Sequence, residues 1–236
     1  MSSVTTEAPS ERPIRERMPA AERRELILGH ASAVFGRTGY AGTTTEQIAQ
    51  AAGISQPYVV RMFGTKEKLF VEVIERALAK LIVAFREIIR QRDAGEIAAD
   101  ELGARLGQAY VDLIEDRGIL MSLMQGFIQG HDDVIGRHAR AGFLEIYRLL
   151  RDEAGIPTDQ VRSFLADGML INTLLAIGMP DNFEGDEAAT ELMNLSFGAK
   201  LDTVLCAASD NQARDKQASD NQTRDKQASD NQTRPL

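Results

Sequence analysis

The spacing of apolar residues fits α-helices along almost the whole chain. One stripe consists of Ile27, Ala31, Val34 and Phe35, and a longer run over residues 69–89 repeats the same spacing of three or four. No stretch alternates apolar and polar residues as a half-buried strand does, so the sequence predicts an all-α fold. Further helices are expected at about 97–116, 118–130, 133–154, 158–179 and 185–207, with glycine-containing breaks between them.

The two ends of the chain differ in composition from its middle. Residues 1–19 lack apolar periodicity and are expected to form a disordered arm, whose Arg12, Arg15 and Arg17 either reach a DNA groove or are simply solvated. Near the other end a ten-residue unit starting at Ala208 recurs, and with alanine as its only apolar residue it cannot stack as a solenoid. We therefore expect a helical unit over 20–66, a larger one over 67–207 and a disordered decapeptide-repeat tail over 208–236.

The net charge of −8 is unevenly distributed. Residues 1–66 carry eight Lys and Arg against six Asp and Glu, a net charge of +2, which leaves −10 for residues 67–236. A basic unit on an acidic body is a reason to look for nucleic-acid contacts near the N-terminus. The one cysteine, Cys206, cannot close an intramolecular disulfide, and we find no secretory signal or membrane-spanning run, so a cytoplasmic protein with no membrane helix is expected.

Between the two apolar runs, the chain has the start and stop signals of two short helices. Thr44 and Gln47 form a T-x-x-Q capping box that starts the first, and Gly53 supplies the left-handed residue that ends it. Ser55 is placed to cap the second, and Thr65 to cap the long helix that follows. Helix, glycine turn and helix at this length predict a helix-turn-helix, although an ordinary helical hairpin has the same spacing.

The second short helix, about residues 56–63, presents a polar face. Because Val59 and Phe63 lie four apart on the inner face, Gln56, Tyr58 and Arg61 are expected to point more outward. Gln can pair with adenine, and Arg can bridge the O6 and N7 atoms of guanine in the major groove. Phosphates can be held by Thr44, Tyr58 and Lys66.

Several spaced motifs in residues 23–75 carry a resemblance: Phe35-Gly-Arg-Thr-Gly-Tyr40, Thr43-Thr44, Ile48-Ala49, Ala52-Gly53-Ile54-Ser55 and Phe63-x-x-Lys66-Glu67-x-Leu69. This part of the chain resembles the N-terminal domain of the tetracycline-repressor (TetR) family of bacterial transcriptional regulators. The resemblance implies an all-helical homodimer. It further implies a three-helix DNA-binding domain over 20–66, and a ligand-binding body over 67–207 that dimerises through its last two long helices.

Carried over residue by residue, the resemblance places Thr44 at a phosphate, Gln56, Pro57 and Tyr58 at the base edges and Lys66 on the DNA backbone. The run 60–62 departs from the Tyr-His-Tyr-like run common in the family, which puts two phosphate contacts in question. Arg61 is expected to compensate with a charge-assisted contact. The full set of expected DNA-contacting residues is Thr44, Ser55, Gln56, Pro57, Tyr58, Arg61 and Lys66.

The body offers methionine and aromatic side chains that suit a cavity for an apolar ligand, because such side chains adapt to varied shapes. The expected lining is Phe85, Met121, Met124, Phe127, Phe143, Tyr147 and Met169. The alternative is that these side chains are simply core. The last two predicted helices carry apolar stripes that fit either a four-helix interface between two copies or packing within one chain.

We find no catalytic or metal-binding pattern in the sequence. His131 and His138 lie near Asp132 and Asp133, but no third converging ligand follows from the spacing. Cys206 has no evident catalytic partner, and phosphate-binding glycine loops are absent from the sequence. We therefore expect no metal, no cofactor and no enzyme activity.

Together these features favour a ligand-responsive transcriptional regulator, most simply a repressor. It would bind a palindromic operator in double-stranded DNA as a homodimer, and a small apolar molecule would release it by shifting the fourth helix. The alternative from another class is a ligand-independent helical module that binds DNA or protein. A weaker alternative is an enzyme built on the helical body.

Overall fold

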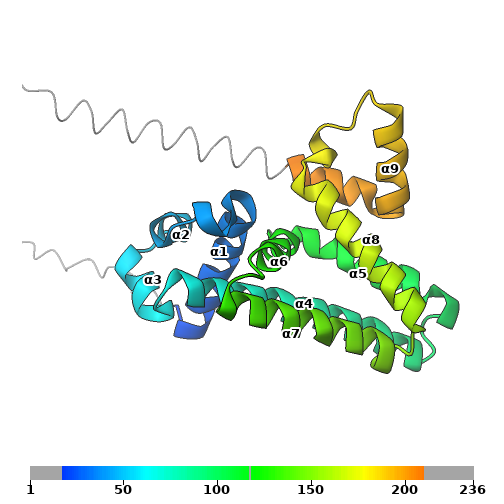
Figure 1. The fold of residues 1–236 in the computed structure, drawn as a ribbon, viewed down its shortest axis with the longest axis horizontal. Helices are drawn as coiled ribbons and strands as arrows, with labels where there is room; N and C mark the ends of the chain where they lie inside the picture. Colours follow the sequence, from blue (N-terminus) through cyan, green and yellow to red (C-terminus); the bar gives the residue numbers. More distant parts are fainter. Residues whose placement is uncertain (1–17, 117, 210–236) are drawn as a thin grey trace, which may run out of the picture.

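The computed structural model describes residues 18–116 and 118–209, and within them the chain forms helices and no strand (Figure 1). The predicted all-α class is confirmed. The predicted arm and repeat tail lie outside the described residues, apart from residues 18–19 and 208–209. The helices are α1 (Ala20–Gly42), α2 (Thr45–Ala51), α3 (Gln56–Phe63), α4 (Lys66–Asp93), α5 (Leu102–Asp112), α6 (Ile119–Ile128), α7 (Asp133–Arg148), α8 (Thr158–Ala176) and α9 (Glu187–Phe197).

Short helical turns complete the described chain. Single 3-10 turns cover Ala99–Glu101, Leu113–Glu115, Met179–Asp181 and Gly198–Lys200, and a π-helical turn, Leu149–Glu153, extends α7. The sequence predicts one helix over 185–207, whereas the structure interrupts it at Gly198, whose φ is 50°, before a further helical segment over 201–209.

Helix α4 connects two parts of the molecule and packs in both (Figure 1). We call α1 to α3 the head and the helices after α4 the body, and α4 is the spine that joins them. It has 28 residues and is therefore ~42 Å long at the usual rise per residue. The Thr65 side chain caps it by accepting a hydrogen bond from the Lys68 backbone N–H at 3.2 Å. The apolar stripe that the sequence predicts is buried along it, including Leu69, Val73, Ile74, Ala77, Leu78, Leu81, Phe85 and Ile89.

An aromatic cluster fastens α1 to the start of α4. The Phe70 ring lies 4.7 Å from the Phe35 ring and 4.9 Å from the Tyr40 ring, centroid to centroid. Phe35 and Phe70 are fully buried. Such pairs contribute about 0.5–1.5 kcal/mol beyond the area they bury, so the orientation of the head on the spine is well determined.

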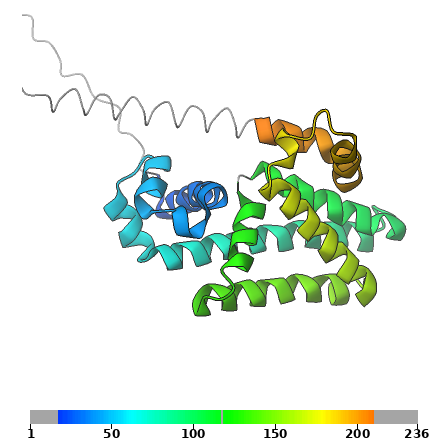
Figure 2. The same ribbon diagram turned by 45° about the horizontal axis from the view of Figure 1, so that its top comes forward.

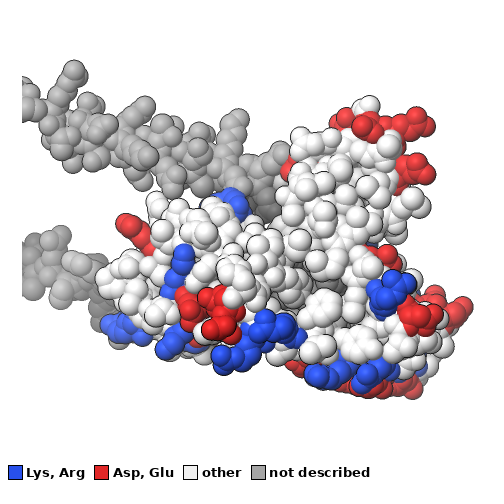
Figure 3. Space-filling model, in the orientation of Figure 1, with Lys and Arg blue, Asp and Glu red and all other residues white. Residues whose placement is uncertain are grey.

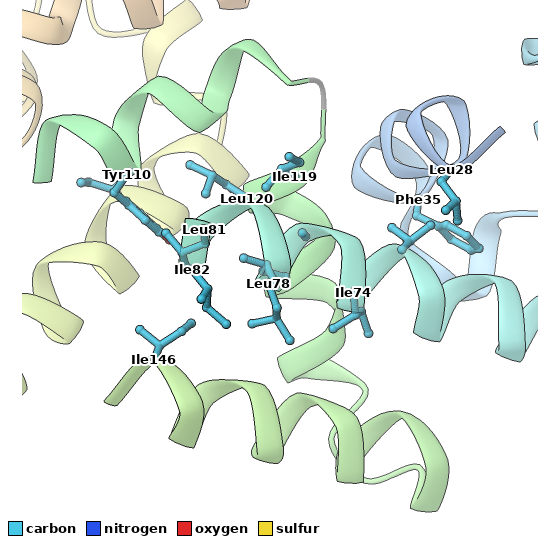
Figure 4. Close-up of a cluster of buried hydrophobic side chains, with 14 of the residues drawn as sticks. Leu28, Phe35, Ile74, Leu78, Leu81, Ile82, Tyr110, Ile119, Leu120 and Ile146 are labelled. Atoms are coloured by element: carbon cyan, nitrogen blue, oxygen red, sulfur yellow. The ribbon is translucent and has the colours of Figure 1, made fainter. Parts of the chain in front are cut away.

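In the body, α5, α6 and α7 pack against α4. Helix α8 packs on α5 and α6, and α9 packs against α8 (Figures 1 and 2). Helix α7 runs alongside α4. Figure 4 shows where four helices contribute to one apolar core: Leu78, Leu81 and Ile82 from α4, Tyr110 from α5, Leu120 from α6 and Ile146 from α7.

Head and body also meet directly, because α6 packs closely against α1. Gly118, just before α6, lies against α1 so tightly that a Cβ atom there would stand 2.3 Å from the Ser32 carbonyl oxygen. The Ser122 hydroxyl donates to that carbonyl at 3.1 Å and lies 3.2 Å from the Ser32 hydroxyl, with both side chains fully buried. A close backbone approach and a buried hydrogen bond therefore join α6 to α1.

An ion-pair cluster reinforces this junction on the surface. Arg76 of α4 donates to Glu25 of α1 at 2.6 Å and to Asp116, in the α5–α6 connection, at 3.0 Å. Lys80 also bonds Asp116. The Arg76 side chain is only 11% exposed, and its carboxylate partners raise the pKa of its guanidinium despite partial burial. A partly buried cation held by two carboxylates ties three segments together.

Within the two described ranges, no helix is both long and apolar enough to cross a membrane.

Candidate nucleic-acid interface

The helix-turn-helix forms as its local signals predict. The Thr44 hydroxyl accepts from the Gln47 backbone N–H at 3.2 Å, while the Gln47 side chain accepts from the Thr44 N–H at 2.8 Å, which confirms the capping box. Gly53 adopts a φ of 65°, a conformation that costs a residue with a Cβ about 1–2 kcal/mol. Ser55 holds the N-cap position of α3, but its side chain makes no capping hydrogen bond, contrary to the prediction.

Helix α3 has one buried face and one exposed face. Val59 and Phe63 are buried against the head as predicted. The opposite face exposes Gln56, Pro57, Val60 and Arg61 to solvent. These four side chains span about one and two-thirds turns of helix. The face they form is polar at both ends and apolar in the middle, which matches what a major groove offers to a protein.

Val60 is a candidate contact that the sequence analysis did not assign. Its side chain is 39% exposed, whereas the neighbouring Val59 is fully buried. It lies one turn after Gln56 on the same face, where an apolar group can touch a thymine methyl. The spacing of four residues was the signal that could have identified it.

Tyr58, which the sequence predicts to point outward, is only partly exposed because it packs against the core, and two guanidinium groups lie near its ring. Arg61 of α3 stands 4.9 Å from the centre of the Tyr58 ring, and Arg23 of α1 stands 5.5 Å from it. Arg23 also donates a hydrogen bond to the Tyr58 hydroxyl at 3.2 Å. The cluster concentrates two positive charges beside the exposed face of α3, which is where a phosphate would be held.

Arg23 is the second candidate contact that sequence reasoning missed. It lies 35 residues before Tyr58, and no local pattern announces that α1 begins beside α3. The neighbouring Arg24 has a different role, because it pairs with Glu72 of α4 and lies 4.6 Å from the Phe63 ring centre. Arg23 therefore lies at the candidate DNA-binding surface, whereas Arg24 holds α1 against α3 and α4.

The Gln56 side chain is already oriented. Its amide nitrogen donates to the Thr45 hydroxyl at 3.2 Å, which links the first residues of α3 and α2. The second N–H and the carbonyl oxygen of the amide remain as a donor and an acceptor, the pair that adenine requires.

Lys66 is more deeply engaged with the protein than the sequence indicates. Its ammonium donates to the Tyr40 carbonyl at 3.0 Å and to the Thr43 carbonyl at 3.1 Å, and it lies 4.5 Å from the Tyr40 ring centre. These bonds satisfy carbonyls at the end of α1. An ammonium has three donors, so one is left for a DNA phosphate.

Charge is distributed along the molecule as the sequence asymmetry predicts. In Figure 3, basic side chains lie along the lower edge together with acidic ones, whereas the charged side chains seen at the α9 end are acidic. Acidic side chains at the end remote from α3 would repel a polyanion.

The body contains a small apolar cavity of about 40 Å³. Four of the predicted ligand-contacting residues, Phe85, Phe127, Phe143 and Met169, line it. Met121, Met124 and Tyr147 are not among its lining residues: Met121 instead packs near Gly36 of α1, and Tyr147 lies under Arg151 at 5.3 Å. The other lining residues are Leu81, Tyr110, Leu123, Ile146, Phe164, Leu165, Gly168 and Asn172.

A larger groove of about 630 Å³ opens beside this cavity, between α5, α8, α9 and residues 198–200. Tyr110, Phe164 and Gly168 belong to the walls of both. The Tyr110 hydroxyl donates to the Asn172 side-chain oxygen at 2.9 Å, and burial raises the pKa of Tyr110 to about 12. The sequence analysis missed this groove because its walls come from three helices far apart in the chain.

No group of three or more His, Cys, Asp or Glu side chains in the described part of the chain is arranged to hold a metal ion. His138 bonds Glu75 of α4 at 2.9 Å rather than joining His131, and Cys206 is exposed.

Comparisons with known proteins agree with the geometry of the head. The model of the bacterial regulatory proteins of the tetR family matches residues 27–73. The HTH-type transcriptional activator FasR of Mycolicibacterium smegmatis is 35% identical over 74 residues, 31% of this chain and 34% of FasR. The HTH-type transcriptional repressor NicS of Pseudomonas putida is 34% identical over 92 residues, 39% of this chain and 43% of NicS.

The fold likeness extends further than the sequence likeness. The crystal structure of a TetR-like transcriptional regulator from Rhodococcus sp. RHA1 superimposes with a TM-score of 0.55 at 24% identity, covering 76% of this chain and 96% of that protein. The chain thus matches 34% and 43% of the length of the two curated relatives in sequence, and it shares the architecture of the solved one.

Proposed function

Since this chain is a member of the TetR family of bacterial regulatory proteins, we propose that it is a ligand-responsive transcriptional regulator. In this proposal a homodimer binds a palindromic operator, most simply as a repressor, and a small apolar molecule releases it. The observation that carries the proposal is the exposed face of α3, where Gln56, Val60 and Arg61 are aligned beside Tyr58 and its two guanidinium neighbours. The names of the relatives are those of regulators, and no catalytic step is part of the proposal.

The proposed division of DNA contacts follows the geometry. Gln56, Pro57 and Val60 would meet base edges, and Arg61 would bridge a guanine or a phosphate. Phosphates would be held by Thr44, Ser55, Tyr58 and Lys66 together with Arg23.

The test is fluorescence anisotropy with a labelled duplex from the DNA flanking the coding region, in excess random-sequence competitor and at two salt concentrations. We expect binding that survives the competitor. Arg61→Ala should weaken it by about 5-fold to 150-fold, the equivalent of one bidentate contact of about 1–3 kcal/mol. Arg86→Ala is the matched control, because Arg86 is an exposed arginine of the body that pairs with Glu153. Binding that the competitor abolishes, or equal losses in both variants, would favour the non-specific interaction module instead.

Dimerisation is proposed through α8 and α9, the helices remote from α3 (Figure 1). They expose large apolar side chains: Leu170 is 40% exposed, Ile177 61% and Leu195 78%. A second copy would cover them, and its twofold symmetry would present two heads to a palindrome. Leu195→Arg should produce monomers in sedimentation equilibrium, whereas Val83→Arg, at an equally exposed valine of α4, should leave the dimer intact. Monomers of the unmodified protein would contradict this part of the proposal.

Ligand release is proposed to act through α6 as well as the fourth helix. The 40 Å³ cavity is far smaller than the about 300–1,000 Å³ of typical ligand sites, so a ligand must push its walls apart. Phe127 of α6 and Phe143 of α7 meet edge to face at 5.6 Å in that wall. Because α6 presses on α1 at Gly118, its displacement would tilt the head.

The thermodynamic requirement is modest. A coupling of about 1–3 kcal/mol changes DNA affinity by about 5-fold to 150-fold, which is enough to clear an operator. It also requires any effective compound to bind the free protein more tightly than the DNA-bound protein by the same factor. Equal affinities for the two forms would contradict the release mechanism without affecting the DNA-binding assignment.

A further inference from the structure

The first residue of the exposed face of α3 is bound to the neighbouring helix. The side-chain amide nitrogen of Gln56 donates a hydrogen bond to the Thr45 hydroxyl at 3.2 Å. Gln56 is exposed, whereas Thr45 is partly buried at the start of α2. The bond therefore joins a residue that the proposed function places at a base edge to a residue to which that function gives no role.

The backbone at both ends of this hydrogen bond is fixed by local structure. Thr45 directly follows Thr44, whose capping box with Gln47 sets the start of α2. Gln56 directly precedes Pro57, whose ring fixes φ in the first turn of α3. The side-chain torsions of Gln56 are what remains to be ordered, and a glutamine loses much rotamer freedom when it is immobilised. A hydroxyl that orders the amide before DNA binds reduces this cost at the interface.

The hydrogen bond also decides which groups of the amide are left for DNA. A free carboxamide has one acceptor oxygen and two N–H donors. It can offer a donor and an acceptor to adenine, or two donors to guanine, whose O6 and N7 atoms both accept. Because Thr45 occupies one N–H of Gln56, one donor and the acceptor remain. This pair matches adenine, whereas guanine would bring its O6 against the amide oxygen with no proton between them.

Contact with DNA should strengthen this hydrogen bond. In the free protein, water competes for the exposed Gln56 amide. A base pair that covers the amide removes this water, and a hydrogen bond is electrostatically stronger where water is excluded. An amide that turned both donors to guanine would leave the Thr45 hydroxyl without this partner inside the interface, and an unpaired buried polar group is costly.

From these observations we propose that Thr45 is a positioning residue for DNA sequence recognition. Its hydroxyl holds the Gln56 amide in the orientation that reads adenine and rejects guanine. Thr45 acts through Gln56 and contacts no base itself. The inference rests on the proposed function, because it concerns the sequence specificity of the same face of α3.

The test begins with selection from a library of duplexes that have a randomised central segment, using the full chain. The selection is repeated with Gln56→Ala. The position at which Gln56→Ala loses its base preference is the position that Gln56 reads, and we expect adenine there. Duplexes that carry each of the four bases at this position, and are otherwise identical, are then compared by fluorescence anisotropy.

Variants of Thr45 separate its hydroxyl from the rest of the side chain. Thr45→Val keeps the branched shape and removes the hydroxyl. It should lower the preference for adenine over guanine by about twofold to tenfold, the equivalent of leaving one long side chain to be ordered on binding. Thr45→Ala is a second variant with the same expected loss, and Thr45→Ser keeps the hydroxyl and should retain the preference. Circular dichroism of each variant shows whether it folds.

Two further variants complete the comparison. Ser55→Ala is the matched control, because it removes a hydroxyl next to Gln56 that makes no capping hydrogen bond. It should change the affinity for all four duplexes by the same factor and keep the adenine preference. When Gln56 is already alanine, Thr45→Val should change no base preference, because the two residues act as one unit.

Three results would overturn the inference and leave sequence-specific DNA binding in place. The first is an equal loss of affinity for all four duplexes in Thr45→Val, as expected of a residue that only holds a phosphate. The second is an unchanged preference in both Thr45→Val and Thr45→Ala. The third is a base other than adenine at the position that Gln56 reads, or no change at any position in Gln56→Ala. A selection that enriches no sequence would remove the proposed function together with this inference.

Discussion

Replacing Gly118 by alanine tests the contact that joins α6 to α1. The new Cβ would stand 2.3 Å from the Ser32 carbonyl oxygen, 2.7 Å from the Ser32 carbonyl carbon and 2.9 Å from the Ala33 Cα atom. All three are backbone atoms, so no side chain can rotate away to make room. Gly118 also has a φ of 77°, which disfavours any residue with a Cβ.

The expected cost has two parts. The left-handed conformation costs about 1–2 kcal/mol, and forcing a methyl group into a packed contact typically costs about 1–3 kcal/mol more. Gly118→Ala should therefore lower the free energy of unfolding by about 2–5 kcal/mol. Gly95→Ala is the matched control, because Gly95 has a φ of 72° but a Cβ there would meet nothing within 4 Å. It should lose only the conformational part, about 1–2 kcal/mol.

Urea unfolding followed by circular dichroism, with both variants at the same protein concentration, measures the difference. Operator binding provides a second measurement, since moving α6 away from Ser32 should weaken DNA binding in Gly118→Ala and not in Gly95→Ala. Equal losses of stability in the two variants would refute the close approach, and unchanged DNA binding in a destabilised Gly118→Ala would refute the proposed transmission from α6 to the head.

Three further predictions follow from single contacts. Lys66→Met should lower the free energy of unfolding by about 1–3 kcal/mol in urea, because the Tyr40 and Thr43 carbonyls lose a charged donor. A loss of DNA affinity with no loss of stability would show that Lys66 only contacts a phosphate and does not stabilise the head. Burial raises the pKa of Tyr110 to about 12, so the folded state favours the neutral phenol. The stability that comes from this preference should be complete below the unfolded pKa of about 10 and should be lost as the pH rises towards 12. Tyr110→Phe should remove this part of the alkaline unfolding curve. Phe85→Ala should lower the free energy of unfolding by about 3–5 kcal/mol, because the Phe85 side chain is 1% exposed. Added butylbenzene should restore part of this stability by filling the enlarged cavity. If butylbenzene does not raise the melting temperature of the variant, the position of the cavity is contradicted.

Much of the head could be predicted because its determinants are local. The capping box at Thr44 and Gln47, the glycine turn at Gly53 and the inward pair Val59 and Phe63 involve residues a few positions apart, and the structure has all of them as expected. Ser55 shows the limit of such reasoning: the residue type suits a cap, but its side chain does not make the bond.

The lining of the apolar cavity in the body could be predicted only in part, for a physical reason. Aromatic and methionine side chains identify the chemistry of a wall, but which of them share a wall depends on how the helices cross. Phe127 and Phe143 face each other across α6 and α7, whereas Tyr147, one turn after Phe143, lies outside the cavity. The Tyr110–Asn172 pair joins residues 62 positions apart, and periodicity carries no information about it.

The sequence by itself determined that the chain is helical, where its head turns and that Val59 and Phe63 form the inner face of α3, because helix periodicity, caps and glycine turns act over a few residues. Only the tertiary structure decided that Arg23 flanks Tyr58, that Lys66 closes the end of α1 and that Gly118 presses on Ser32. Each of these contacts joins helices that are distant in sequence, and their geometry is set by the packing of the whole core around α4.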